Sequence, residues 1–298
     1  NISGLLIDLR DNGGGSLQEA IKLVSLFIDS GPTVQVRNSD DQVQVESDQI
    51  PRALYNGPMA VLVNRYSASA SEIFAGAMQD YGRAVIVGGQ TFGKGTVQSL
   101  MDLNHGELKM TRAKFYRVSG ASNQHRGIIP DLELPYAVDK TEIGESALPN
   151  ALPWDRIEAA DYDPAAELDS VIPELREAHE ERIASHPEFE YVRRQIELLE
   201  HNRQRDRVTL HADQRKQREE ERNQRRLAIE NKLREYRGKD PVDSIEELKK
   251  IREEQAMEAA SNPESRNDRP DPHLRETGRI VADLVKPRAD DTKVAGKP

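Results

Sequence analysis

The chain has 298 residues, a formal net charge of −10 and no cysteine. This length suits about two domains, and the lack of cysteine excludes thiol catalysis, thiolate metal sites and disulfides. The negative charge argues against a general affinity for nucleic acid, and no apolar run approaches the roughly 18 residues of a membrane span.

Residues 1–15 predict a buried strand that ends in a glycine turn. No signal peptide precedes this strand, so we expect a mature or truncated piece of a longer protein. An amphipathic helix follows, and its apolar face consists of Leu17, Ala20, Ile21, Val24 and Phe27. Three consecutive glycines leave backbone N–H groups unhindered beside a helix N-terminus, where they can bind a developing oxyanion. A plain tight turn is the alternative, whereas the glycine spacings of phosphate-binding loops are absent.

An apolar strand at 59–63 leads to Ser69, and residues 72–79 predict a helix after it. A second apolar strand, at 84–87, leads to Lys94, which stands between two glycines. This layout can bring a hydroxyl and an amine together from two loops. A lysine becomes a general base towards a serine when burial lowers its pKa. A helix N-cap and a solvated loop charge remain the alternative roles for the two residues.

Histidine offers a weaker catalytic scheme. None of the seven histidines falls in a His-Glu-x-x-His motif. His105 and His125 lie in the first half of the chain, so a Ser-His-Asp triad stays open on residue count alone. Both stand in polar, turn-like stretches, which favours solvated loop positions for the two imidazoles.

The second half is highly charged and mostly helical. Residues 167–200 predict helix with irregular apolar spacing, interrupted by Pro173 and Pro187. Residues 203–237 are rich in Arg, Gln and Glu and lack a sustained heptad. They predict an exposed helix, or one packed along a narrow stripe, rather than a coiled coil.

Two further helices are expected towards the C-terminus. One spans 243–260, with its cap at Asp243 or Ser244, and the other spans 274–285 after a loop. The helical half is expected to be a structural buttress, with a docking surface for a partner as the alternative.

Three sequence blocks, in order along the chain, carry a resemblance to a known family. They are DLRDNGGG at 8–15, SASASE at 67–72 and TFGKGTVQ at 91–98. These blocks resemble the signatures of the carboxyl-terminal processing proteases, also called tail-specific proteases, which are serine peptidases with a Ser-Lys dyad. The large periplasmic type of Gram-negative bacteria is the most similar. The resemblance continues through AKFYRVSG at 113–120, GIIPD at 127–131 and NALPWD at 150–155.

The resemblance implies Ser69 as the nucleophile and Lys94 as the general base. Gln98, four residues after the lysine, is implied to orient the lysine amine. The implied oxyanion donors are the backbone N–H groups of Gly14, Gly15 and Ala70.

Further matching positions are Glu72, Asp80 and Thr91. Asp80 lies eleven residues beyond Ser69, and on a helix this separation corresponds to about 16 Å along the axis. We therefore expect Asp80 to support the site rather than join a triad, and to pair with a cation such as Arg83.

The fold implied is an α/β protease core of crotonase/ClpP-like β-α architecture, followed by a mainly α-helical C-terminal domain. We expect the C-terminal part of the peptidase core at 1–140, the helical domain at 141–285 and a disordered tail at 286–298. Members of the family carry a PDZ domain and part of the protease fold ahead of the first block. Neither is recognisable in this chain.

The function implied is a periplasmic serine endopeptidase that selects proteins by their C-terminal tails. The expected partners are proteins with unstructured apolar C-termini, an adaptor protein and the periphery of the inner membrane. No cofactor, metal or nucleic acid is expected. The alternatives are an inactive truncated fragment that serves as a helical protein-binding module, and a Ser-Lys amidase or esterase.

Overall fold

The computed structural model of the chain describes residues 2–47, 53–164, 168–204, 207–261 and 271–286. The chain divides into two compact units, one of Asn1–Glu180 with His273–Pro298 and one of Glu181–Pro272. The domain limits expected at 1–140 and 141–285 stay a prediction. The expected disordered tail lies outside the described residues apart from Lys286. Within the described ranges, no helix has the length and apolar character needed to cross a membrane.

A parallel sheet forms the centre of the first unit. Its strands are β1 (Leu5–Asp8), β4 (Met59–Val63), β5 (Val85–Gly88) and β8 (Leu132–Glu133), in the order β1-β4-β5-β8. Every residue of β4 is buried, as expected for an inner parallel strand covered on both faces. The expectation of a buried first strand is wrong, because β1 is only partly buried and its last residue is exposed. It lies at the edge of the described sheet and has a neighbour on one side only.

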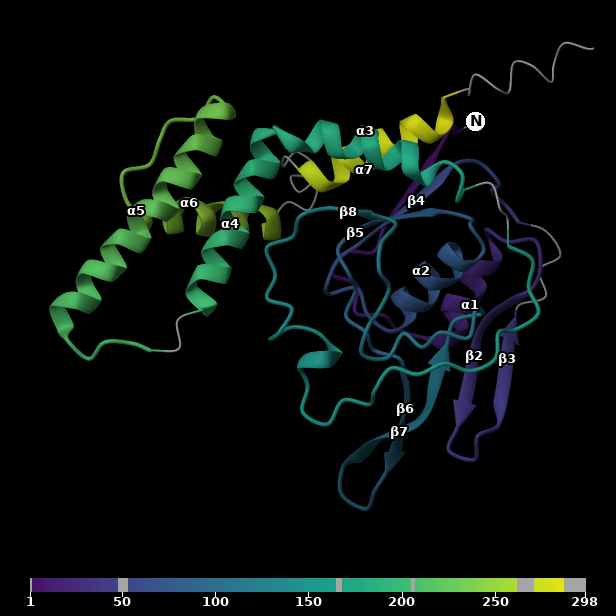
Figure 1. The fold of residues 1–298 in the computed structure, drawn as a ribbon. Coiled ribbons are helices and arrows are strands. Elements are labelled where there is room, and N and C mark those ends of the chain that lie inside the picture. Colours follow the sequence, from purple (N-terminus) through teal and green to yellow (C-terminus); the bar gives the residue numbers. More distant parts are fainter. Residues whose placement is uncertain (1, 48–52, 165–167, 205–206, 262–270, 287–298) are drawn as a thin grey trace, which may run out of the picture. The chain divides into compact units, whose positions relative to one another are not determined.

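Two helices separate this sheet from a second, antiparallel sheet (Figure 1). They are α1 (Leu17–Ser25) and α2 (Ala70–Asp80). The second sheet has the order β3-β2-β7-β6 and consists of β2 (Pro32–Asn38), β3 (Val43–Ser47), β6 (Thr96–Asp102) and β7 (Glu107–Tyr116). In α2, Phe74 packs with the parallel sheet and Ile73 with the antiparallel one. The helices therefore contribute to two cores, which fixes the loop before α2 between the sheets.

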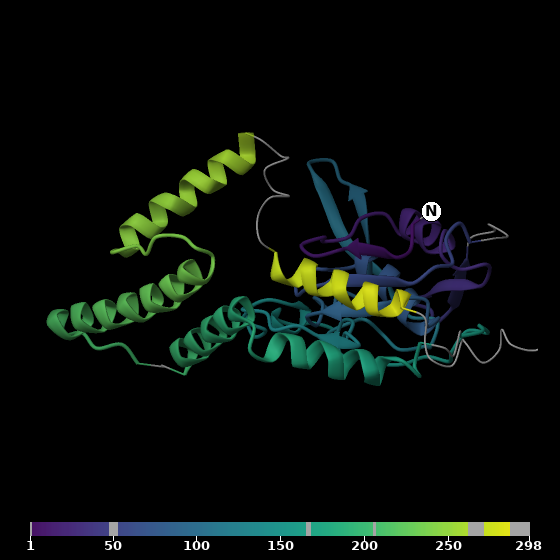
Figure 2. The same cartoon turned by 90° about the horizontal axis from the view of Figure 1, so that it is seen from above.

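Helices α3 (Ile172–Ala184) and α7 (Pro272–Val285) run side by side (Figure 2). His179 of α3 lies 3.3 Å from Glu276 of α7, and both side chains are 1% exposed. The other ring nitrogen of His179 lies 3.1 Å from the Glu133 carbonyl of β8. A side chain at Gly4 would come within 2.5 Å of Val281, so α7 packs closely against the chain before β1. The last helix is therefore part of the first unit.

The second unit contains α4 (Pro187–Arg203), α5 (Ala212–Tyr236) and α6 (Ile245–Ser261). The predicted interruption at Pro187 is confirmed, since α4 begins at this proline, where its missing N–H is tolerated. Among the described residues of α5 only Leu233 is buried, which confirms the expectation of a helix that is exposed or packed along a narrow stripe. The cap expected before α6 is also confirmed, because the Glu247 N–H donates to Ser244 Oγ at 3.1 Å.

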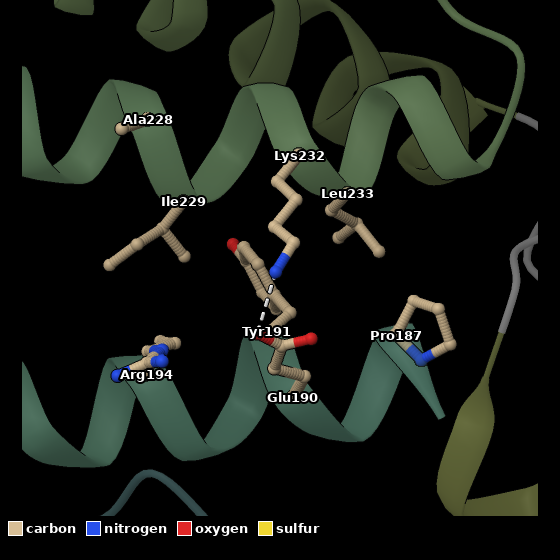
Figure 3. A pocket seen from close by; sticks show the side chains of 8 residues that line it. All are labelled: Pro187, Glu190, Tyr191, Arg194, Ala228, Ile229, Lys232 and Leu233. Atoms are coloured by element: carbon tan, nitrogen blue, oxygen red, sulfur yellow. Dashed lines mark hydrogen bonds and ion pairs between the residues drawn. The ribbon is translucent and has the colours of Figure 1, made fainter. Parts of the chain in front are cut away.

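A cavity of about 210 Å³ lies between α4 and α5 (Figure 3). The Glu190–Lys232 ion pair, 2.7 Å long, crosses it from one helix to the other. Leu233 and Ile229 contribute apolar side chains to its lining. Neither the predicted serine nor the predicted lysine lines this cavity.

The mixed α/β core and the helical region that follows confirm the predicted fold class.

Candidate functional site

Ser69 occupies a sharp turn between β4 and α2. Its backbone has φ 58° and ψ −114°, a conformation that is unfavourable for a residue with a side chain. The turn is fixed from the glycine segment: the Asn12 carbonyl accepts hydrogen bonds from Ala68 N–H and Ser71 Oγ, each at 3.0 Å. Strained turns of this kind recur where a nucleophile is held exposed at the start of a helix. Ser69 is partly exposed, as a nucleophile must be.

The glycine turn lies directly against the Ser69 turn. Gly14 has φ 91°, and a Cβ on it would lie 2.6 Å from the Ala68 carbonyl oxygen and 2.7 Å from the Ala70 nitrogen. Only glycine fits this conformation and this approach. The structure therefore brings Gly14 and Ala70 together, as the sequence blocks implied.

The predicted oxyanion donors differ in their present hydrogen bonds. The Gly14 N–H donates to Asn12 Oδ1 at 3.0 Å, so it reaches an oxyanion only if that bond breaks. Among the described residues, the N–H groups of Gly15 and Ala70 have no acceptor. Gly15 and Ala70 are thus the donors available in this conformation.

Glu72 connects the serine turn to the lysine loop. Its side chain is fully buried, and each of its two oxygens accepts two hydrogen bonds. Oε1 accepts from Thr91 Oγ1 at 2.5 Å and from Gly93 N–H at 2.7 Å. Oε2 accepts from Ser69 N–H at 2.8 Å and from Lys94 N–H at 2.9 Å. Because the last two donors share one oxygen, the backbone nitrogens of Ser69 and Lys94 lie no further apart than the sum of those distances.

The protonation of Glu72 reflects two opposed effects. Burial disfavours the carboxylate, whereas the four donors favour it. Burial is the larger effect and raises the pKa of Glu72 to about 7. The Glu72 carboxyl group joins the two loops and is called here the clamp. It therefore titrates near neutral pH.

Two residues that the sequence did not single out form hydrogen bonds to the main chain of the lysine loop. Gln124 is fully buried, and its Oε1 accepts from Gly95 N–H at 2.9 Å while its Nε2 donates to Glu145 at 2.9 Å. Buried Arg65 donates to the Thr91 carbonyl at 2.5 Å and to the Ile143 carbonyl at 2.7 Å. The only sequence signal for Gln124 was its place beside His125.

Thr91 is one of the further positions that match the family blocks. Its side chain is fully buried, and Oγ1 donates to Glu72 and accepts from Ile128 N–H at 2.7 Å. Thr91 therefore anchors the start of the lysine loop to Glu72.

Among the described residues, no hydrogen bond joins Gln98 to Lys94. Lys94 is partly buried and Gln98 is exposed in β6, next to an irregularity in the pairing with β7. Within the described part of the chain, the Lys94 amine has no hydrogen bond or ion pair. The structure thus places the lysine backbone beside the Ser69 turn without a hydrogen bond from Gln98 to the lysine amine, and the role of Gln98 stays a prediction.

The partner expected for Asp80 was wrong. Asp80 pairs with Arg117, the residue after β7 (Glu107–Tyr116), through both carboxylate oxygens and also accepts from Ser119 Oγ at 3.0 Å. Arg83 instead donates to the Tyr55 carbonyl and to two other main-chain carbonyls. The chain turns at a glycine between Asp80 and Arg83, so the two side chains diverge although they are close in sequence.

Neither histidine considered for a triad has a hydrogen bond to Ser69 among the described residues. His105 and His125 are both exposed, and neither imidazole has a hydrogen-bond partner among the residues described. The main chain of His125 contributes more, since its N–H donates to the Gly93 carbonyl at 2.8 Å. The described residues also contain no group of three or more His, Asp or Glu side chains suited to a metal ion.

The clamp leads to a prediction for Glu72→Gln. The substitution replaces one carboxylate oxygen with an NH2 group, which donates and cannot accept. The two hydrogen bonds that this oxygen now accepts would therefore be lost. We expect a roughly 10²-fold loss of kcat/KM, because small displacements of a catalytic group are costly. The fold should persist in circular dichroism, and a variant within threefold of the parent would contradict the clamp.

The same variant tests the pKa of Glu72. A carboxyl group whose folded pKa is raised to about 7 from an ordinary 4.5 binds more protons folded than unfolded between these values, so its contribution to stability falls as pH rises through that window. We expect the parent's stability in urea, relative to Glu72→Gln, to be lower at pH 8 than at pH 5. The opposite trend would mean that the four donors outweigh burial.

Comparisons with known proteins agree with the sequence blocks. Residues 1–134 match the model of peptidase family S41, and residues 138–286 match the C-terminal domain of tail specific protease. The "Tail-specific protease" of Haemophilus influenzae is 39% identical over 293 residues, which are 94% of this chain and 40% of that protein. The chain therefore spans well under half of that relative.

Shorter matches cover less than half of the chain. The "Carboxy-terminal-processing protease" of Bartonella bacilliformis is 42% identical over 133 residues, 44% of this chain and 31% of that protein. Among solved structures, the photosystem II D1 C-terminal processing protease is 34% identical with a TM-score of 0.41, and the match covers 45% of this chain and 35% of that one.

Proposed function

We propose, since this chain belongs to peptidase family S41 and carries the C-terminal domain of tail-specific proteases, that it is part of a serine endopeptidase with a Ser69–Lys94 dyad. The observation that supports the dyad best is the Glu72 carboxylate, which accepts hydrogen bonds from the backbone of both residues. One buried side chain thereby fixes the nucleophile turn and the base loop in a common frame.

The proposed reaction begins with Ser69 Oγ attacking the scissile carbonyl carbon. The unprotonated Lys94 amine takes the hydroxyl proton and then donates it to the departing amine. The N–H groups of Gly15 and Ala70 stabilise the oxyanion, joined by Gly14 when its bond to Asn12 opens. Water then attacks the acyl-enzyme, again with Lys94 as the base, and releases the carboxylate product and Ser69.

We further propose that the substrates are proteins with unstructured apolar C-termini and that the protein acts in the periplasm. The names of two relatives, "Tail-specific protease" and "Carboxy-terminal-processing protease", support the C-terminal tail as the feature that is selected. An adaptor protein and the surface of the inner membrane are the proposed partners of the whole protein.

Tail selection is tested with two otherwise identical unstructured substrates, one ending in a free apolar carboxylate and one amidated. We expect the 298-residue chain to cleave both poorly, with kcat/KM values within about threefold, because remote binding energy accelerates cleavage only when the remote site is present. We place that site in residues of the longer relatives that this chain does not span.

A chain that also spans the additional residues of the longer relatives should have a kcat/KM raised far more for the free carboxylate than for a short internal peptide. Strong discrimination by the 298-residue chain would instead place the tail-binding site within these residues. Turnover of a peptide against the matching ester separates the peptidase from an amidase or esterase, and labelling by a fluorophosphonate separates an active chain from an inactive binding module.

A further inference from the structure

The β6–β7 hairpin is an exposed apolar surface. It extends away from α1 and α2 as a two-stranded ribbon in both views of the molecule (Figures 1 and 2). Large apolar side chains that are 37% to 63% exposed lie along it: Leu100, Met101, Leu103, Leu108 and Met110. Such a concentration of exposed apolar residues on one short element marks an interaction surface.

The pairing register sorts these residues onto two faces. Met101 lies directly opposite Leu108, and Ser99 lies opposite Met110. Opposite residues of an antiparallel pair share a face, and successive residues alternate between faces. Met101, Leu108 and Met110 therefore share one face, called here the hairpin face, and Leu100 lies on the other.

The outer edge of β6 is open. It is the last strand of its sheet, and no described strand pairs with its outer side. An open edge presents unpaired N–H and C=O groups that can bind an extended chain. The sequence of β6, TVQSLMD, carries one charge, at Asp102, and no proline. It thus lacks the lysines and prolines that commonly protect an edge strand.

The open edge is continuous with the candidate site. β6 begins at Thr96, two residues after Lys94, which corresponds to about 7 Å of extended chain. The other edge of the sheet, β3, also carries exposed apolar residues, Val43 and Val45. Two strands separate β3 from β6, so β3 lies about 14 Å across the sheet from this edge. Both edges carry exposed apolar residues, so what distinguishes β6 from β3 is that β6 lies next to Lys94.

We propose that the outer edge of β6 and the hairpin face bind an extended apolar segment of the polypeptide substrate by strand addition. The main chain of the segment pairs with β6, and alternate apolar side chains contact the hairpin face. The bound segment then runs directly towards Ser69 and Lys94. This inference rests on the proposed peptidase function and names the feature of the substrate that the site selects, an extended apolar stretch on one side of the scissile bond.

The test uses the 298-residue chain with the double substitution Met101→Ser and Leu108→Ser, and Val43→Ser with Val45→Ser as the matched control at the other edge. The substrates are a 20-residue unstructured apolar peptide and a four-residue chromogenic peptide. We expect the hairpin variant to raise KM for the long peptide about tenfold, with kcat nearly unchanged. Cleavage of the short peptide, and the control variant with both substrates, should match the parent.

Strand pairing has its own readout. Successive N–H groups of a strand point to opposite edges, so N-methylation of alternate residues removes the donors on one edge only. Two such peptides are made, one methylated at the odd and one at the even positions. The peptide that loses the donors facing β6 should be cleaved poorly and the other well. Equal cleavage of both methylated peptides, or an equal loss in the hairpin and control variants, would overturn the proposal.

Binding is also measured without catalysis, which separates this inference from the proposed function. Fluorescence anisotropy of the labelled 20-residue peptide against Ser69→Ala should give a Kd that the added hairpin substitutions weaken about tenfold. If the parent fails to react with a fluorophosphonate but this weakening is observed, the dyad is wrong and the binding surface stands. If the chain sediments as a dimer that the hairpin substitutions dissociate, a second copy occupies the edge and the inference is wrong.

Discussion

Ser69→Ala should lower kcat/KM for peptide cleavage by at least about 10³-fold. The substitution removes the only atom proposed to attack the carbonyl. It leaves the main-chain bonds that fix the turn, from Ser69 N–H to Glu72 and from Ala68 N–H to Asn12. Alanine and serine tolerate the positive φ equally poorly, so the melting temperature should change little. Loss of activity without loss of fold identifies a chemical role.

Ser67 and Ser71 are the internal controls for this prediction. Ser67 Oγ donates to the Leu9 carbonyl at 2.8 Å, and Ser71 Oγ donates to Asn12. Their alanine variants should lose about 1 kcal/mol of stability each, yet they should keep most of the activity and react with a fluorophosphonate. If Ser69→Ala stays within tenfold of the parent, the nucleophile is misassigned and these two serines become the candidates.

Lys94→Arg should be as inactive as Lys94→Ala. Arginine retains the positive charge but does not release a proton near neutral pH, so it cannot act as a general base. The Lys94 N–H bond to Glu72 involves the main chain and survives both substitutions. We therefore expect losses of at least about 10³-fold in kcat/KM for both, with unchanged circular dichroism. Comparing arginine with alanine separates a role in proton transfer from a role as a charge.

The two histidines of the first half complete this test. His105→Ala and His125→Ala should be nearly silent, since both imidazoles are exposed. Substantial activity in Lys94→Arg would exclude the dyad mechanism, and a large loss in either histidine variant would restore a histidine triad.

Local sequence patterns determined much of the first unit and the course of the second. An uninterrupted apolar run predicted β4 over the residues at which it forms. Apolar spacing, a proline and a cap predicted where α4 and α6 begin, within two residues. These features depend on neighbours within a few residues, so the information is present in short stretches. The glycines and small residues of the three blocks likewise predicted tight turns around the serine and the lysine, and the roles of the two residues stay a prediction.

Tertiary structure alone decided which side chains join these blocks. Glu72 binds the Lys94 backbone 22 residues away, and Asp80 pairs with Arg117 at a separation of 37 residues rather than with nearby Arg83. Buried Gln124 holds Gly95 from a third loop. The physical reason is that an unpaired buried polar group is costly, so most such groups have a partner. The sheet order and helix packing, not closeness in sequence, determine which partner lies within hydrogen-bonding distance.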